Sequence, residues 1–371
     1  MSFIIVPYTK AEEEGVKRFN QRLASKGFRF RFPEVWEPSW LPKISQRKLF
    51  QDFFLLKEEG EIRGAYILKR QEFFIRDQVR SIGYYHFPIS EGIIDKRYNG
   101  VGLFLIKDAL KREPCLFSLG IGGLEEPLAQ LLKILGWRLF SVPFFFKVFR
   151  IRNFFKKMQY FNQSLSLKIL SGLLLFSGLG FLLIKGYQGA VGIKGRLLSS
   201  RIKAVIVPKF EEWTNEIWVK SKREYKFVAK RDQEVLNILY PSSNKRFIKI
   251  KILEKEQIIG WAVVMNTQMN DNRYFGSMQI GSIVDFMALS RQETKIIGAS
   301  LNILRNKGVD MVVMNQSSSC WKRAIRSCGF INGPSNFIFA CSPQLSRELD
   351  LESNMHDVFL CRGDGDGPIN L

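Results

Sequence analysis

One short pattern occurs twice in the chain and decides its fold: Ser81-Ile82-Gly83-Tyr84-Tyr85 and, in the second half, Gln279-Ile280-Gly281-Ser282-Ile283. In both, an Ile-Gly pair lies inside an apolar run, which is typical of a strand. Another glycine follows 17 residues after the first, at Gly100 and at Gly298, and each begins a helical pattern. The equal spacing indicates that the two halves share one structural plan.

The flanking segments extend this match in both directions. Upstream, each half has a polar turn and then a glycine that begins an apolar run, at residues 60–68 and 256–264. Downstream, each helical pattern is followed by a strand, a second helix and a Gly-aromatic pair, Gly136-Trp137 or Gly329-Phe330. This order predicts an internal duplication. We expect each copy to be a β–β–β–α–β–α–β unit, antiparallel at first and then with a strand–helix–strand crossover.

The duplication divides the 371 residues into four parts. We expect an α+β (α/β) protein with one mixed-sheet domain at residues 1–152 and a second at residues 203–346. Residues 153–202 join them as a basic bridge rich in Phe and Leu, and residues 347–371 form a tail. We expect its last residues, Cys361 to Pro368, to be disordered, because they offer no apolar face.

The positive charge is concentrated in the middle of the chain. The net charge is +21, and residues 127–210 contain 14 Lys and Arg but no Asp or Glu. Within them, the 16 residues from Ile169 to Ile184 carry no charge, which is short of the about 20 needed for a membrane span. Three interpretations stay open: a buried interdomain helix, attachment to an anionic membrane surface, or a true span. No recognition motif accompanies the charge, so no nucleic-acid partner is expected.

The cysteines and the N-terminal residues indicate in which cellular compartment the protein is expected. The five cysteines are scattered and form no C-x-x-C pair, so we expect neither a disulfide framework nor a metal site. Residues 1–8 are apolar, but Glu12, Glu13 and Glu14 follow at once, unlike the continued apolar run of a signal peptide. We therefore expect a cytoplasmic protein, with attachment to the cytoplasmic face of the membrane as an open alternative.

A candidate anion site lies between the strand and the helix of the first copy, at Arg97-Tyr98-Asn99-Gly100-Val101-Gly102. Its glycines let the backbone turn tightly and approach a ligand closely. The unpaired N–H groups and the dipole of the helix that follows favour a phosphate or pyrophosphate there. Arg97 adds a cation with a fork of donors.

This motif, Arg97-x-x-Gly100-x-Gly102, resembles the Q/R-x-x-G-x-G/A signature of the GNAT (Gcn5-related N-acetyltransferase) superfamily, and the two Gly-aromatic pairs resemble its Gly-Phe pair. The resemblance implies a tandem GNAT protein that uses acetyl-CoA or another acyl-CoA as co-substrate and needs no metal. It implies pairing of the pantetheine arm with a splayed strand around residues 91–93, and direct attack of an amine acceptor on the thioester. It further implies that the amides of Asn99 to Leu103 hold the pyrophosphate, so the predicted coenzyme site comprises Arg97, Tyr98, Asn99, Gly100, Val101, Gly102 and Leu103.

The second copy departs from the motif. Its equivalent stretch, residues 292–299, keeps Gly298-Ala299 but lacks the arginine and the first glycine. Lys295 takes the place of Arg97, and Glu293 adds a negative charge near the expected phosphate. We therefore expect the first copy to bind acyl-CoA and the second to shape the acceptor side.

Three ionisable residues are candidates for the chemistry. His86 lies 11 residues before Arg97, and an imidazole titrates near neutrality, so it is either a general base or a core histidine. Glu91 is a second candidate base, with a surface carboxylate as the alternative. Asp285 lies inside an apolar run, where an acid needs partners, and is a candidate for the acceptor side.

Two functions follow from these features. The first is an N-acyltransferase that transfers an acyl group from acyl-CoA to an amine. The alternative is a non-catalytic, GNAT-like scaffold that binds acyl-CoA or associates with membranes.

Overall fold

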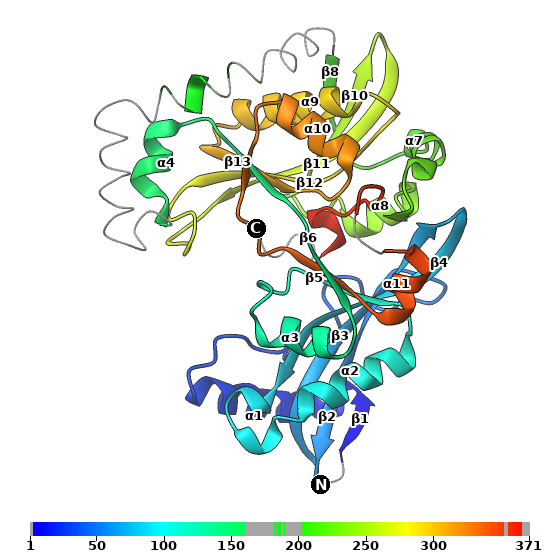
Figure 1. The fold of residues 1–371 in the computed structure, drawn as a ribbon, viewed down its shortest axis with the longest axis vertical. Helices are drawn as coiled ribbons and strands as arrows, with labels where there is room; N and C mark the ends of the chain where they lie inside the picture. The colour runs from blue at the N-terminus through cyan, green and yellow to red at the C-terminus, as the bar shows by residue number, and fades with distance from the viewer. Residues whose placement is uncertain are drawn as a thin grey trace. The chain divides into compact units, whose positions relative to one another are not determined.

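The structure is a computed structural model that describes residues 3–159, 182, 184–186, 189, 202–351 and 355–365 (Figure 1). The chain forms two compact units, and neither is continuous in sequence. Unit 1 consists of Met1–Ser141 and Ile338–Ser353, and unit 2 consists of Val142–Phe337 and Asn354–Leu371. These boundaries differ from the contiguous domains expected from the sequence.

Unit 1 is built on a mixed sheet with the strand order β1-β2-β3-β4-β5-β15-β6. Helix α2 connects the parallel strands β4 and β5, and this strand–helix–strand connection is the predicted crossover. The elements of unit 1 are β1 (Ile4–Pro7), η1 (Lys10–Glu12), α1 (Glu13–Ser25), β2 (Phe50–Glu58), β3 (Glu61–Ile75), β4 (Gln78–Ser90), η2 (Glu91–Ile93), η3 (Lys96–Tyr98), α2 (Val101–Arg112), β5 (Leu116–Leu119), α3 (Pro127–Ile134), β6 (Arg138–Ser141), β15 (Ile338–Cys341) and α11 (Pro343–Leu349).

Helices α1 and α2 pack on opposite faces of this sheet, because successive side chains of a strand point to opposite sides. In β2, Phe53 and Leu55 join the cluster that contains Val16, Phe19 and Leu23 of α1. Phe54 and Leu56 join the cluster of α2 instead. The sheet of unit 1 is therefore buried on both faces.

Unit 2 repeats the same order with the strands β8-β10-β11-β12-β13-β7-β14. Its elements are β7 (Phe144–Val148), α4 (Ile151–Lys157), β8 (Ile202–Val207), α7 (Trp213–Ser221), η5 (Lys222–Glu224), β9 (Phe227–Ala229), α8 (Gln233–Leu239), β10 (Ile248–Glu254), β11 (Gln257–Gln268), β12 (Gln279–Ala288), α9 (Glu293–Asn306), β13 (Met311–Asn315), α10 (Ser319–Ser327), β14 (Ile331–Gly333) and η6 (Arg362–Asp364). The duplicated α+β architecture predicted from the repeat is thus confirmed.

The two copies exchange their last strands. Strand β15, from the second copy, lies between β5 and β6, where Ala340 is opposite Ser118 and Leu139. Strand β7, from the first copy, lies between β13 and β14. The exchange explains why contiguous domain boundaries do not describe the chain: each sheet is complete only with a strand from the other copy.

The glycine that begins each repeated apolar run has the same structural role in both copies. A Cβ on Gly64 would lie 2.6 Å from Val101 Cγ1 at the start of α2. A Cβ on Gly260 would lie 2.8 Å from Ile296 Cδ1 in α9, and 2.4 Å from the carbonyl oxygen of Met287. Glycine is needed at both positions because the helix packs directly on the strand there.

The Phe-rich residues before the bridge belong to the core of unit 2. Phe145 and Val148 of β7 are buried, and Ile151 and Phe154 of α4 pack in one apolar cluster with Val148. Of the uncharged run 169–184, only residues 182 and 184 are among those described, so the interpretations of that run stay predictions. None of the helices in the described ranges is both long and apolar enough to cross a membrane.

Part of the predicted disordered tail is ordered. Residues 355–365 pack in unit 2, where Val358, Phe359 and Leu360 are buried and supply the apolar surface that the last residues lack. Arg231 joins this segment to β12: it donates to Asp364 at 2.7 Å and to Asp285 at 2.8 Å, with all three side chains almost fully buried. The expectation of disorder is therefore wrong for residues 361–365, and residues 366–371 lie outside the described part.

The strand exchange predicts an effect at long sequence distance. Replacing Ala340, which is fully buried in β15, by Glu places a charge inside the sheet of unit 1. Hydrogen exchange in β5 and β6 is then expected to accelerate by at least about tenfold, because opening of this sheet becomes easier. Asn332→Glu on exposed β14 is the control. If hydrogen exchange became faster only near residue 340, the placement of β15 between β5 and β6 would be contradicted.

Candidate functional site

The candidate coenzyme loop of unit 1 connects β4 to α2. Two 3-10 turns occupy it, η2 at Glu91–Ile93 and η3 at Lys96–Tyr98, so the expectation of a splayed strand at residues 91–93 is wrong. Side chains stabilise both turns: the Ser90 hydroxyl accepts a hydrogen bond from the Gly92 N–H at 3.1 Å, and Asp95 accepts from the Arg97 N–H at 3.0 Å. Capping of this kind gives the loop a defined conformation.

Strand β4 is irregular just before this loop. His86 of β4 pairs with Ile67 of β3, and Ile89 of β4 pairs with Ala65 of β3. These two pairs are three residues apart in β4 but only two residues apart in β3. The extra residue forms a bulge, and Phe87 has a positive φ of 51° within it. Bulges redirect the strand and the side chains that follow, so the irregularity sets the direction in which the chain enters the loop.

Glu91 is buried at the start of the loop. Its Oε1 accepts a hydrogen bond from Arg22 Nε at 2.7 Å, and its Oε2 accepts one from Arg63 Nη1 at 3.0 Å. A surface carboxylate, the alternative considered for this residue, is therefore excluded, since only 4% of Glu91 is exposed. With both oxygens held by guanidinium groups, Glu91 acts in this structure as an anchor of the loop.

Tyr98 anchors the other end of the loop. Its ring is buried in the same apolar cluster as Val101 and Leu105 of α2. The Arg63 guanidinium lies over this ring at 4.6 Å, so one arginine contacts both anchors. Gly92 packs against the Tyr98 backbone, where a Cβ would come within 2.5 Å of the carbonyl oxygen. The structure thus brings Glu91 and Tyr98 together around Arg63.

The amides available to a ligand are fewer than the sequence predicted. The Asn99 N–H donates to the Lys96 carbonyl at 3.2 Å, and the Leu103 N–H donates to the Gly100 carbonyl at 3.0 Å. No side chain caps the helix at Gly100. The candidate donors for an anion are therefore the N–H groups of Gly100, Val101 and Gly102, which face outward from the first turn.

Neither glycine of this turn is required by the fold. Gly100 has an ordinary helical φ of −75°, and the nearest atom to a Cβ built on it would be 4.0 Å away. A Cβ on Gly102 would likewise meet only Leu131, at 3.6 Å. Side chains would fit at both positions without a ligand. The space that the glycines leave open fits the approach of a pyrophosphate to the amides.

Arg97 lies at the surface beside this turn. Its side chain is 73% exposed, and its guanidinium donates to both oxygens of Asp95, the shortest contact being 2.6 Å. The hydrogen bond to Asp95 raises the pKa of Arg97, and the same bond lowers the pKa of Asp95. Because the pair is exposed, a phosphate can compete with Asp95 for the guanidinium.

His86 is half-buried on β4, next to the bulge. Its ring stacks on Tyr84 with the ring centres 4.7 Å apart, and the Tyr84 hydroxyl donates to the Leu119 carbonyl at 2.9 Å. The Lys69 ammonium lies 5.1 Å from the same tyrosine ring. The imidazole is therefore held in place by a fixed aromatic neighbour.

The second copy lacks the loop altogether. Helix α9 begins at Glu293, so residues that align with the first copy's loop are helical, and only residues 289–292 separate α9 from β12. Lys295, aligned with Arg97, is paired with Glu254 at 2.6 Å. The geometry therefore gives unit 2 no counterpart of the open glycine turn.

Asp285 lies in the interior of unit 2, in a different unit from His86 and Glu91. It has no exposed surface, and its oxygens accept from Arg231 and from the Tyr240 hydroxyl, each at 2.8 Å. Burial raises the pKa of Asp285, and the Arg231 charge acts against this effect. The carboxylate is occupied by Arg231, which also donates to Asp364, and it faces no open surface. The acceptor-side role of Asp285 stays a prediction.

Sequence reasoning missed Arg22 and Arg63. A signal for Arg63 was present in the repeat: the position before the shared glycine is Arg63 in the first copy and Ile259 in the second. The partner position, Glu91, aligns with Leu289, and the two apolar residues are adjacent, since the Leu289 N–H donates to the Ile259 carbonyl at 2.9 Å. A charged pair in one copy thus replaces an apolar pair in the other.

Metal ligands do not gather anywhere in the described ranges. No group of three or more His, Cys, Asp or Glu side chains there is arranged to hold an ion.

Comparisons with known proteins find similarity only among solved structures. No protein-family model matches the sequence, and no curated protein matches it. N-myristoyltransferase from Saccharomyces cerevisiae with bound myristoyl-CoA has a TM-score of 0.50 and 10% identity, over 92% of this chain and 78% of that chain. A probable N-acyltransferase from Enterococcus faecalis V583 has a TM-score of 0.49 and 8% identity, over 92% and 72%. A tandem GNAT protein from the clavulanic acid biosynthesis pathway has a TM-score of 0.46 and 11% identity, over 92% and 98%.

The chain therefore has a fold similar to that of N-myristoyltransferase, and this fold contains the duplication that the repeat predicted. At these identities the likeness concerns the fold, and the activity has to be argued from the site.

The anchoring role of Glu91 predicts a stability effect that a neighbouring acid does not share. Glu91→Gln leaves two guanidinium groups without their buried partner, and we expect a loss of about 2–4 kcal/mol in the free energy of unfolding. Glu61→Gln is the matched control, because Glu61 also pairs with Arg22 but its side chain is 39% exposed. Its loss should stay below about 1 kcal/mol. Equal losses in urea denaturation would show that Glu91 is not the anchor.

Proposed function

We propose that the protein is an N-acyltransferase that takes an acyl group from acyl-CoA and transfers it to an amine. The observation that supports this most is the start of α2, where three amides face open space beside two glycines that the fold itself does not need. When bound, acyl-CoA supplies the activated thioester. Gly100, Val101 and Gly102 would hold its pyrophosphate through their N–H groups, and Arg97 would add a cation at the surface.

The two units have different roles in this proposal. Unit 1 binds the coenzyme, and unit 2, which lacks the open turn, serves the acceptor side. The basic segment 153–202 extends the proposal to an anionic membrane surface on the cytoplasmic side, because cations near such a surface contribute about 1 kcal/mol each. The Phe residues of β7 do not support this part, since they pack in the core.

His86 is the residue we propose as general base. An amine nucleophile must lose a proton, and a base is effective when its position is fixed relative to the reacting atoms. The stacked Tyr84 ring fixes the His86 imidazole on the strand that leads into the coenzyme loop. Glu91, the other candidate, is a weaker base candidate because both of its oxygens are held by arginines.

Coenzyme binding is tested by a substitution that the fold should tolerate. Gly100→Glu places a carboxylate where the pyrophosphate would lie, in space that no protein atom fills. We expect the affinity for acetyl-CoA or myristoyl-CoA, measured by calorimetry, to fall by at least about 30-fold with an unchanged melting temperature. Ser45→Glu, the same charge change on an exposed loop of unit 1, should have no effect. If the unaltered protein binds no acyl-CoA, the proposal fails.

The proposed role of His86 as general base can be tested separately from acyl-CoA binding. His86→Gln is expected to keep acyl-CoA affinity while turnover, followed as release of CoA in the presence of the acceptor amine, falls by about 100-fold. The only other histidine, His356, supplies the matched control, and His356→Gln should retain full turnover. Equal turnover in the two variants would leave His86 as a packing residue.

A further inference from the structure

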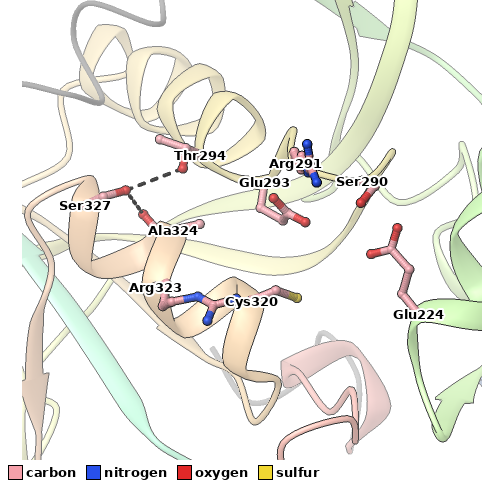
Figure 2. Close-up of a pocket in the computed structure, with 9 residues that line it drawn as sticks. All are labelled: Glu224, Ser290, Arg291, Glu293, Thr294, Cys320, Arg323, Ala324 and Ser327. Carbon is pink, nitrogen blue, oxygen red and sulfur yellow. Dashed lines mark hydrogen bonds between the residues drawn. The ribbon is translucent and has the colours of Figure 1, made fainter.

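Unit 2 contains a cavity of about 510 Å³ beside the short connection between β12 and α9. It lies between the start of α9, the turn after β12, the end of η5 and one face of α10 (Figure 2). A cavity of this size matches the pockets that hold small molecules. This connection has four residues, 289–292, whereas ten residues, 91–100, connect β4 to α2 in unit 1.

Two carboxylates converge on this cavity. Figure 2 shows Glu224 and Glu293 pointing toward each other from opposite walls, with Ser290 between them and Cys320 below. Within the described ranges, neither carboxylate forms a salt bridge with a Lys or Arg, although the chain carries a net charge of +21. Arg291 and Arg323 line the same cavity, so a positive ligand group is favoured only in the space between the two carboxylates.

The pKa shifts of Glu224 and Cys320 agree with the closeness of the two carboxylates. Burial raises the pKa of Glu224, the Ser290 hydroxyl opposes the rise, and the Glu293 charge adds to it. Burial also raises the pKa of Cys320, and both carboxylates contribute to the rise. The negative charge of Glu293 thus adds to the effect of burial at both Glu224 and Cys320.

We propose that this cavity binds a small organic amine, with its ammonium group between Glu224 and Glu293. A metal ion fits less well: two carboxylates are too few ligands for one, and in the described part of the chain no third ligand completes a set. An ammonium needs only hydrogen-bond acceptors, which the two carboxylates and the Ser290 hydroxyl provide. Arg323 lines another wall and suits a hydroxyl or anionic group on the same ligand.

Binding of a defined probe to the full chain tests the site directly. We expect 1,4-diaminobutane to bind, and the neutral isostere 1,4-butanediol not to bind, in ligand-observed NMR. Glu224→Gln and Glu293→Gln should each weaken the diamine by at least about tenfold. Glu216→Gln is the matched control, since Glu216 lies on nearby α7 with a side chain that is 72% exposed, and it should bind like the unaltered protein.

A second measurement needs no substitution. Cys320 lines the cavity and Cys115 lies in unit 1, and both are partly exposed. The diamine should slow alkylation of Cys320 by iodoacetamide and leave Cys115 unaffected, as followed by peptide mass spectrometry. The site is refuted if the diamine gives no protection at about 10 mM, or if inorganic pyrophosphate protects Cys320 instead. The outcome is independent of acyl-CoA binding, because Gly100→Glu should leave the protection unchanged.

Discussion

The buried ion pair between Glu91 and its two arginines is the interaction on which the candidate coenzyme site depends. Arg22 comes from α1 and Arg63 from β3, so the carboxylate joins a helix, a strand and the first residue of the loop. Arg63 also lies over Tyr98, at the far end of the loop. A buried charge is costly without partners, so the loop is held in the one arrangement that satisfies it. That arrangement leaves the first turn of α2 open to an anion.

The two copies show what happens when this constraint is absent. In the second copy Ile259 and Leu289 replace the charged pair, the loop shrinks and α9 starts earlier. The residues that would form an anion site there become helical, and their amides bond within the helix. The cavity beside α9 is lined by Glu224 and Glu293, with Arg291 and Arg323 on its other walls, and it has no counterpart of the open glycine turn. We therefore propose that the two copies of one fold bind ligands of different charge.

The sequence predicted those parts of the molecule that local patterns determine. Strand and helix order, the crossover and the glycine turn all follow from periodicity and spacing, and they agree with the structure within a few residues. The exchange of β7 and β15 was not predictable, because both strands have the same apolar pattern and nothing local says which sheet they join. Glu91 was interpreted as a possible base because its partners lie far away in sequence, at Arg22 and Arg63. The ordered segment 355–365 was missed because its apolar residues, Phe359 among them, precede the polar end that dominated the interpretation.

The proposed function depends most on whether the amides at the start of α2 bind the coenzyme pyrophosphate. The most direct measurement is an amide spectrum of protein labelled with ¹⁵N-glycine, titrated with coenzyme A, with signals assigned by single Gly→Ala variants. We expect the Gly100 and Gly102 signals to move on titration, while that of Gly281 in unit 2 stays in place. Unchanged Gly100 and Gly102 signals at saturating coenzyme A would contradict it.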